Sequence, residues 1–181
     1  MSEDLVYASA TELLEGYKSG TISPVEATKA ALDQISRYDG ALNAFVFVDK
    51  EGALKQAAAS EERWHSGNPM GLVDGIPTTV KDIMLMKGFP TLKGSKLVDK
   101  NGSWDEDAPS VARLRENGAV FLGKTTTPEF GWKGVTDSPL SGVTRNPWNP
   151  ETTPGGSSGG ASAACAAGMG VLHTGSDGGG S

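Results

Sequence analysis

Two clusters of glycine and serine decide how this chain folds: GGSSGG at residues 155–160 and GSDGGGS at residues 175–181. Glycine lets the main chain take conformations closed to other residues and lets neighbouring groups approach closely, so such clusters indicate loops with a special backbone. Between them, GASAACAAGMG predicts a helix of very small residues, and MGVLHTG predicts a short strand. This order of loop, tightly packed helix, strand and loop would bring both serine clusters to one end of the fold.

Upstream of these clusters, helix and strand patterns alternate. Ser9 and Ser23 begin sequences of capping-box form, and the helix after Ser23 is expected to stop near Gly40. The segments that follow predict a strand at 43–49, a helix at 50–67, a strand from 77 to about 82, a helix at 107–118 and a strand at 119–124. Strands and helices that alternate with short links favour an α/β layer structure.

A long irregular segment, residues 125–154, separates these elements from the first glycine cluster. It is rich in proline, glycine, threonine and tryptophan. An irregular stretch of this length inside a compact chain is usually functional or a linker. Its aromatic side chains, together with Trp104, favour an ordered pocket wall; they are Phe130, Trp132 and Trp148.

Composition excludes several classes of function. The chain has 181 residues, a net charge of −6 and 37% hydrophobic residues, values typical of a globular protein. It shows no basic stripe, so we expect no direct binding of nucleic acid. No apolar run approaches the roughly 20 residues that span a bilayer. The first residues include acidic side chains and lack the apolar run of a secretory signal peptide. We therefore expect a cytoplasmic protein that does not associate with membranes.

Cysteine and histidine are too sparse for a metal site. Cys165, the one cysteine, lies among small apolar residues; we expect it to be buried, and a single cysteine fits a reducing compartment. His65 falls in the last turn of a predicted helix, where a histidine complements the helix dipole, and His173 stands alone. Metal sites need clustered ligands, so the sequence predicts neither a metal nor a cofactor.

Three chemistries could use serine-bearing glycine loops. A phosphate-binding P-loop would need a lysine after the glycines, and none follows either cluster. Gly156–Gly160 contains a G-x-S-x-G match with Ser158 at its centre, as in an α/β-hydrolase esterase, but no strand directly precedes it and His173 comes before Asp177 rather than after. A longer chain could still supply those partners. The third chemistry, a serine activated by a neutral lysine, needs no histidine.

Lys81 fits this third chemistry best among the lysines considered. A lysine with an ordinary pKa near 10.4 is neutral about once in a few thousand molecules at pH 7, so keeping it neutral takes roughly 4–5 kcal/mol. Burial supplies that energy because desolvation penalises the charged form. Lys81 has apolar neighbours in GIPTTVKDIMLMKG, residues 75–88, whereas polar surroundings indicate solvation for Lys87, Lys93, Lys96 and Lys100.

Three segments in this order resemble the amidase signature family, serine hydrolases with a Ser-Ser-Lys triad: GIPTTVKD, TPGGSSGGASAACAAG and GSDGGGS. The N-terminal helices, DAPSVARLRENGAVFLGKTTTPEFG and TRNPWNP extend the resemblance over nearly the whole chain. It implies a three-layer α/β/α fold with a central mixed, twisted sheet that N-terminal helices precede. Residues 1–181 would be the N-terminal portion of one such domain, with a helical region at about 1–70 and part of the catalytic core at 71–181.

The resemblance also implies the catalytic residues. Ser181 would be the nucleophile that attacks an amide carbonyl, and Lys81 would be the final base. Ser157 would relay the proton between them and would follow a cis peptide bond from Gly156. The family's spacing between relay and nucleophile matches Ser157 and not Ser158, which is assigned to supporting hydrogen bonds.

The second glycine cluster would stabilise the reaction intermediate. The N–H groups of Gly178, Gly179, Gly180 and Ser181 would form an oxyanion hole, which typically contributes a hundredfold or more per donor. Asp177 would hold the turn as a structural acceptor rather than act as an acid.

The implied reaction is hydrolysis of a small-molecule amide through an acyl-enzyme. The resemblance slightly favours a stand-alone amidase, which could form a homodimer. The alternative is the glutaminase subunit of a tRNA-dependent amidotransferase, which would need partner subunits. A non-catalytic binding module is disfavoured because all three triad positions are intact. Family members continue for several hundred residues more, so we expect this chain to be part of a longer protein and residues 1–181 alone to be inactive.

Overall fold

The structure, a computed structural model, describes residues 5–181; the first four residues of the expected helical region lie outside the described part. In chain order the elements are α2 (Ala10–Ser19), α3 (Pro24–Leu42), β1 (Phe45–Val48), α4 (Lys50–His65), β2 (Pro77–Lys81), α5 (Pro109–Glu116), β3 (Val120–Thr125), the 3-10 turn η1 (Glu129–Gly131), β4 (Asp137–Ser138), β5 (Gly142–Val143), α6 (Gly159–Ala166) and β6 (Leu172–His173). No helix in residues 5–181 is long and apolar enough to cross a membrane.

A mixed four-stranded sheet forms the centre of the fold. Its strand order is β1-β3-β2-β6, with β1 antiparallel to β3 and with β2 parallel to both β3 and β6. A parallel connection requires a crossover, and the α5 crossover between β2 and β3 provides one. The short β4–β5 pair lies outside this sheet. The predicted α/β class with a mixed sheet is therefore confirmed.

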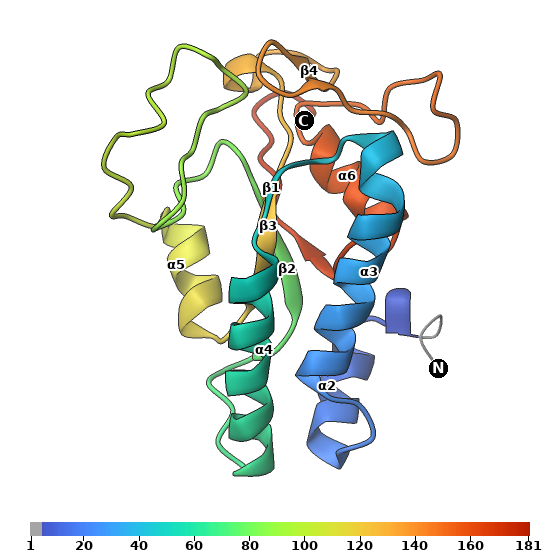
Figure 1. Ribbon diagram of the computed structural model, residues 1–181, viewed down its shortest axis with the longest axis vertical. Coiled ribbons are helices and arrows are strands. Elements are labelled where there is room, and N and C mark those ends of the chain that lie inside the picture. Colours follow the sequence, from blue (N-terminus) through green and yellow to red (C-terminus); the bar gives the residue numbers. More distant parts are fainter. Residues whose placement is uncertain (1–4) are drawn as a thin grey trace.

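Helices cover both faces of the sheet, as Figure 1 shows with α5 on one side and α3 and α6 on the other. Val120 and Leu122 of β3 belong to one apolar cluster with α3, α4 and α6, in which alanines of α4 and α6 allow close packing. Phe121, between them, packs with Val80 and Val111 on the α5 face. The alternation of β3 side chains thus builds a core on each side of the sheet.

The helix starts follow the local sequence signals, and one helix end does not. Ser9 and Ser23 each complete a capping box, as predicted. The helix that begins at Pro24 runs two residues past Gly40, to Leu42, because the chain stops it with Asn43 in the left-handed conformation. The stop near Gly40 was therefore placed slightly early.

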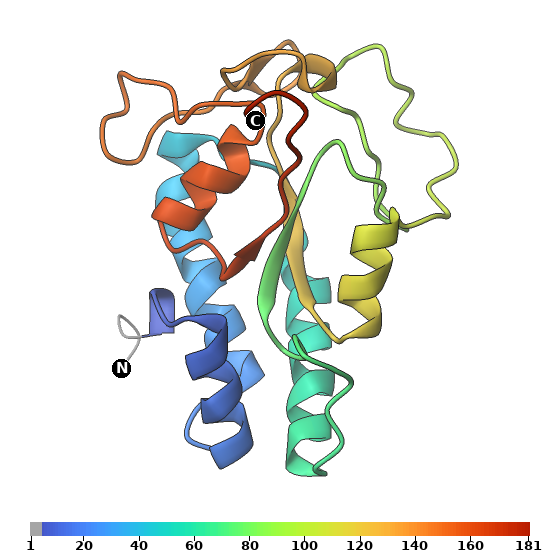
Figure 2. The same cartoon turned by 180° about the vertical axis from the view of Figure 1, so that it is seen from behind.

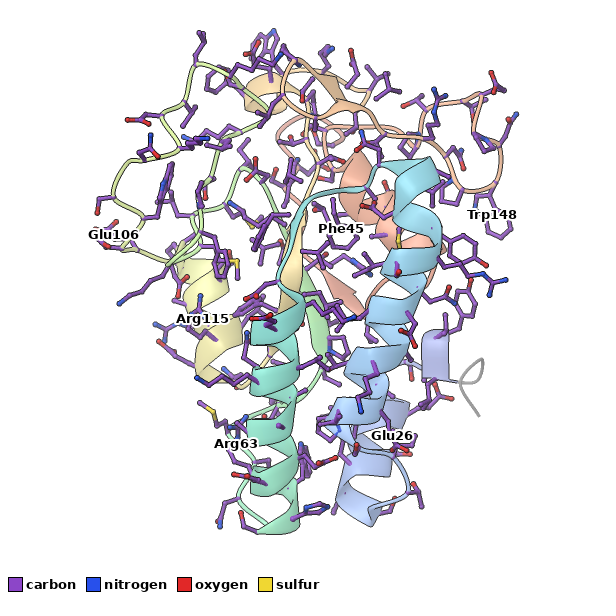
Figure 3. The ribbon with its side chains drawn as sticks, viewed as in Figure 1. Glu26, Phe45, Arg63, Glu106, Arg115 and Trp148 are labelled. Carbon is purple, nitrogen blue, oxygen red and sulfur yellow. The ribbon has the colours of Figure 1, made fainter. Side chains whose placement is uncertain are left out.

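Two expectations about side-chain environments are corrected. Cys165 is exposed rather than buried, because it lies on the face of α6 that is turned away from α3. The aromatic residues do not build one pocket wall: Trp148 is 86% exposed at the molecule's periphery (Figure 3), and Trp132 is 89% exposed. Of these two tryptophans, Trp132 alone borders a cavity at the serine loops.

Both glycine–serine clusters lie at one end of the fold, as the order of elements predicted. In Figure 2 the chain leaves β6, runs to the C-terminus and passes beside the start of α6. Ser158 and Ser176, one from each cluster, are hydrogen-bonded to each other, which ties the two loops together.

Candidate active site

The lysine identified from sequence is the last residue of a fully buried strand. Every residue of β2 from Pro77 to Lys81 is buried, and Lys81 itself is 0% exposed. Its main-chain N–H donates to Thr174 Oγ1 (2.9 Å), and the next N–H, of Asp82, donates to Thr125 O (3.0 Å). These bonds fix the strand end on both sides and so set the direction of the lysine side chain.

The loop that carries the first serine pair is held by one threonine. The Gly156–Ser157 peptide bond is cis, as the family resemblance implied. Thr136, 2% exposed, donates its hydroxyl hydrogen to Gly155 O (2.9 Å) and accepts from the N–H of Gly159 (3.0 Å). One hydroxyl therefore clamps the residues before and after the serine pair. Thr136 carries no signal in the sequence that would have indicated this contact.

The amine of Lys81 lies among three hydroxyls. Its Nζ is 2.7 Å from Ser157 Oγ, 2.9 Å from Ser158 Oγ and 2.9 Å from Ser176 Oγ. The structure thus brings Lys81 together with Ser157 and Ser158, two of the residues predicted from sequence. Ser176 was missed, because its place in GSDGGGS gives no local sign that it reaches a lysine 95 residues earlier.

Burial lowers the pKa of Lys81 to about 8, and the nearby charge of Asp177 opposes this shift only in part. Within residues 5–181, no carboxylate forms an ion pair with this amine. A buried lysine whose hydrogen-bond partners are hydroxyls loses its proton more easily than one paired with a carboxylate, because burial penalises the ammonium and the charge of Asp177 offsets that penalty only in part.

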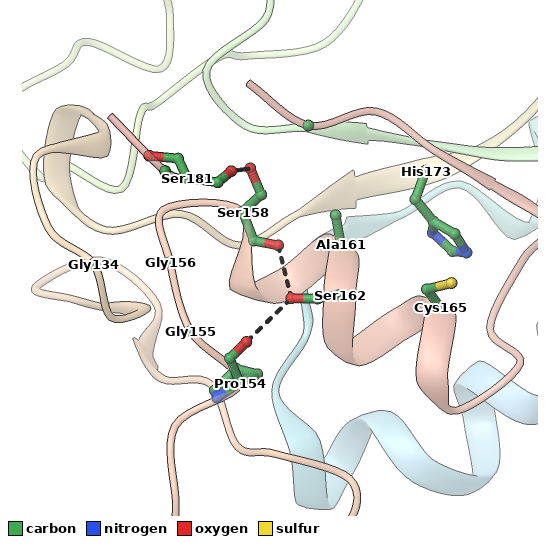
Figure 4. Close-up of a pocket in the computed structure, with 12 residues that line it drawn as sticks. Gly134, Pro154, Gly155, Gly156, Ser158, Ala161, Ser162, Cys165, His173 and Ser181 are labelled. Carbon is green, nitrogen blue, oxygen red and sulfur yellow. Dashed lines mark hydrogen bonds between the residues drawn. The ribbon is translucent and has the colours of Figure 1, made fainter. Parts of the chain in front are cut away.

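Ser181 lies where two cavities meet. One cavity, of about 610 Å³, runs along α6 toward Cys165 and His173, and Figure 4 shows these two residues at its far end. The other, of about 530 Å³, is lined by Ser157, Ser176 and Trp132. Four residues line both cavities: Gly134, Gly156, Gly180 and Ser181.

The hydroxyl groups of Ser157 and Ser181 are not hydrogen-bonded to each other in the described chain. Ser181 is instead held through its main-chain oxygen, which accepts from Ser158 Oγ at 2.9 Å (Figure 4). Ser158 therefore contacts both the lysine amine and the main chain of Ser181. Ser181 itself lines both cavities.

Asp177 holds the glycine turn that precedes Ser181. Its Oδ1 accepts the N–H groups of Gly179 (3.0 Å), Gly180 and Ser181 (2.9 Å). These bonds lower the pKa of the Asp177 carboxyl, so it stays ionised. Three of the four N–H groups assigned to an oxyanion hole thus point at this carboxylate; among residues 5–181 the N–H of Gly178 has no acceptor. The oxyanion-hole assignment stays a prediction.

A second buried lysine lies across the sheet from the site. Lys124 of β3 is 1% exposed and forms an ion pair with Asp82 (2.8 Å), the residue that follows Lys81. Its Nζ also donates to Pro90 O (3.0 Å) and Thr91 Oγ1 (2.5 Å). Lys124 was not among the lysines singled out from the sequence. Its partners anchor the long segment after β2 to the sheet.

The two histidines take no part in the serine–lysine contacts. His173 Nδ1 lies 2.8 Å from Thr79 Oγ1, and burial lowers the pKa of His173 to about 4, which keeps the ring neutral. His65 is in the last turn of α4, as predicted. Residues 5–181 contain no group of three or more histidine, cysteine, aspartate or glutamate side chains that could hold a metal ion.

The lysine, the cis serine and the two glycine loops agree with comparisons to known proteins. Residues 26–181 match the family described as Amidase. The chain belongs to the amidase family. It is 42% identical over 173 residues to an indoleacetamide hydrolase of Bradyrhizobium diazoefficiens, a match that covers 96% of this chain and 33% of the relative. It is 43% identical to a glutamyl-tRNA(Gln) amidotransferase subunit of Thermobifida fusca, over 98% of this chain and 36% of the relative.

Solved structures of this amidase family share the fold. The crystal structure of a bacterial aryl acylamidase of the amidase signature family matches with a TM-score of 0.84 and 37% identity, over 91% of this chain and 34% of that chain. This match confirms the fold predicted from the resemblance. The chain spans about a third of the length of the curated relatives it matches.

Proposed function

We propose that the protein containing this chain hydrolyses a carboxylic amide through an acyl-enzyme on Ser181. The observation that carries this proposal is the buried Lys81 amine 2.7 Å from Ser157 Oγ, with no ion-pair partner among the described residues. Such an amine can accept a hydroxyl proton, which is the task of a general base.

In the proposed reaction, Ser157 passes its proton to Lys81 and takes the proton of Ser181 as Ser181 attacks the amide carbonyl. The C–N bond breaks when the proton returns through Ser157 to the leaving amine. Water then attacks the acyl-enzyme and loses a proton along the same route. That proton returns through Ser157 to Ser181 as the bond between the acyl group and Ser181 breaks and the acid leaves. The N–H groups after Asp177 would bind the oxyanion of each tetrahedral intermediate, competing with the carboxylate that now accepts them.

A specific observation supports a second candidate function, that of the glutaminase subunit of an amidotransferase. The hydrolase and the amidotransferase protein reported above match this chain almost equally, at 42% and 43% identity. The same triad chemistry would then release ammonia from glutamine for a partner subunit. We favour the stand-alone amidase, because hydrolysis by itself needs neither a second active site nor a channel for ammonia.

An active-site-directed fluorophosphonate tests the proposal on the full-length protein. We expect covalent labelling that Ser181→Ala and Lys81→Met abolish, while Ser110→Ala, an exposed serine on α5, labels normally. Labelling on Ser158 would instead support the esterase alternative, and no labelling would contradict the proposal. Labelling that appears only when partner subunits are added would favour the amidotransferase.

A further inference from the structure

The amine of Lys81 has more hydroxyl partners than the proposed relay uses. Ser157, Ser158 and Ser176 all lie within 2.9 Å of Nζ, and only Ser157 has a role in passing the proton. A neutral amine has two N–H groups and one lone pair, so it can donate to two hydroxyls and must accept from the third. Which hydroxyl faces the lone pair decides which one the lysine can deprotonate.

Ser158 cannot be the hydroxyl that donates to the lone pair. Its single hydrogen is already directed at main-chain oxygens, those of Ser181 (2.9 Å) and Ser176 (3.2 Å). Ser158 Oγ also accepts from the N–H of Ser176 (3.3 Å). Since a hydroxyl has one hydrogen and two lone pairs, Ser158 accepts a hydrogen bond from Lys81.

Ser157 is the hydroxyl that faces the lone pair. It is 2% exposed, it is the nearest of the three to Nζ, and within the described residues its hydroxyl has no acceptor other than the lysine. A buried hydroxyl hydrogen without an acceptor is costly, so Ser157 donates to Lys81.

Ser176 is then left to accept the second N–H. It is only half-buried and lines the 530 Å³ cavity, so its own hydrogen can turn into that cavity. We propose that Ser176 is a positioning residue: with Ser158 it accepts the two N–H groups of neutral Lys81 and so aims the lone pair at Ser157. This inference rests on the proposed function.

The same geometry serves the protonated state. When Lys81 has taken the proton, Ser157 becomes an acceptor, and all three N–H groups of the ammonium have a hydroxyl partner. Loss of the Ser176 hydroxyl therefore disfavours the charged amine and lowers the pKa of Lys81 further.

Other charged groups around the amine are accounted for. Asp177, from the loop after β6, raises the pKa of Lys81, and its carboxylate is held by main-chain N–H groups rather than by Ser176. Lys133, at the rim of the cavity, is paired with Asp137. Asp82 follows Lys81 directly and so points to the opposite face of the sheet, where it forms an ion pair with Lys124 of β3. The His173 ring is neutral.

The test compares Ser176→Ala and Ser176→Thr in the full-length protein, with Ser110→Ala as the serine-to-alanine control. We expect Ser176→Ala to lower kcat about tenfold to a hundredfold, with KM changed less than about twofold. The acid limb of its pH–rate profile should move down by about half a pH unit to one unit. Ser176→Thr, which keeps the hydroxyl, should restore most of the rate and the position of the limb.

Three results would overturn the inference: wild-type kcat in Ser176→Ala, a reduced kcat with an unmoved acid limb, or a threonine variant no better than alanine. The second result would show a purely structural role. Failure of the proposed function is recognised separately, because Lys81→Met would then keep activity whatever Ser176 does.

Discussion

Lys81 is completely buried, and its amine has polar but uncharged hydrogen-bond partners. This combination decides how easily the amine gives up its proton. Desolvation alone would make a buried lysine a destabilising group, and a carboxylate partner would keep it protonated. Three serine hydroxyls satisfy the amine in either protonation state without favouring the cation as a carboxylate would. Its neighbour Lys124, equally buried, is instead paired with Asp82 and serves structure.

The pKa of Lys81 predicts the pH dependence of activity. Burial lowers this pKa from 10.5 to about 8, and the base must be neutral to act, so activity is lost as pH falls through about 8. Below that pH, kcat/KM of the full-length protein should fall about tenfold per unit. A pH–rate profile with an amide substrate measures this; a flat profile between about pH 6 and pH 8 would contradict it. Lys81→Met should be inactive at every pH.

At the scale of elements, the serine pair is positioned by contacts between segments that are far apart in sequence. Thr136 clamps the loop before α6, and α6 packs against β3 so closely that its second residue can only be glycine. A Cβ on Gly160 would overlap the main chain at Thr126 N and at Ala44 O, which lies 2.6 Å away. The small residues of α6 therefore set how near the serines lie to the end of β2.

The Thr136 clamp predicts a difference between two conservative substitutions. Thr136→Val keeps the shape but leaves the N–H of Gly159 and the carbonyl of Gly155 without their partner, which should cost about 1–3 kcal/mol of the free energy of unfolding. Thr136→Ser keeps the hydroxyl and should lie near wild type. Denaturant unfolding and the rate of fluorophosphonate labelling report both effects. A valine variant as stable and reactive as the serine variant would exclude the clamp.

Replacing Gly160 by alanine should change the stability of the fold in the opposite direction from replacing Gly40, a glycine of α3, by alanine. Gly160→Ala places a methyl group against main-chain atoms that cannot move aside, so it should lower the free energy of unfolding by about 1–3 kcal/mol. Gly40→Ala, at an exposed position of α3 with nothing within 4 Å of the new Cβ, should raise it by about 0.5–1 kcal/mol. Thermal unfolding of both variants tests the pair; equal shifts would show that α6 can move.

At the scale of the whole molecule, the sheet separates the face that carries the serine loops from the face that anchors the irregular segment after β2. Lys81 reaches the serine loops at the start of α6, whereas Asp82 and Lys124 tie the irregular segment after β2 to the sheet through Pro90 and Thr91. The two buried lysines thus lie on adjacent strands and point to opposite faces of the sheet.

Breaking the buried ion pair should destabilise the whole fold. Lys124→Met leaves Asp82 buried and unpaired, at a cost of about 3–5 kcal/mol in the free energy of unfolding. The double variant Asp82→Asn with Lys124→Met removes both charges and should recover part of that loss. Denaturant unfolding of the single and double variants gives the coupling between the two residues. A double variant less stable than Lys124→Met alone would contradict the buried pair.

The sequence by itself determined most of the elements and the family. Capping boxes, the buried run that ends at Lys81 and the alternation of strands with helices are local signals, so the helix starts, the strands of the central sheet and the α/β class could be read directly. The short β4–β5 pair lies in the segment that was expected to be irregular. The three motifs in order determined the family, and the assignment of Ser181, Ser157 and Lys81 to its triad, which that resemblance implies, stays a prediction.

Only the tertiary structure decided how those residues are held. Ser176 and Thr136 reach their partners across the fold, and the pairing of Lys124 depends on which face of β3 its side chain takes. Cys165 was expected to be buried because its sequence neighbours are apolar, but it is exposed in the folded chain. The reason is physical: hydrogen bonding, burial and pKa depend on which segments pack together, and residues distant in sequence leave no periodicity that reveals their contact.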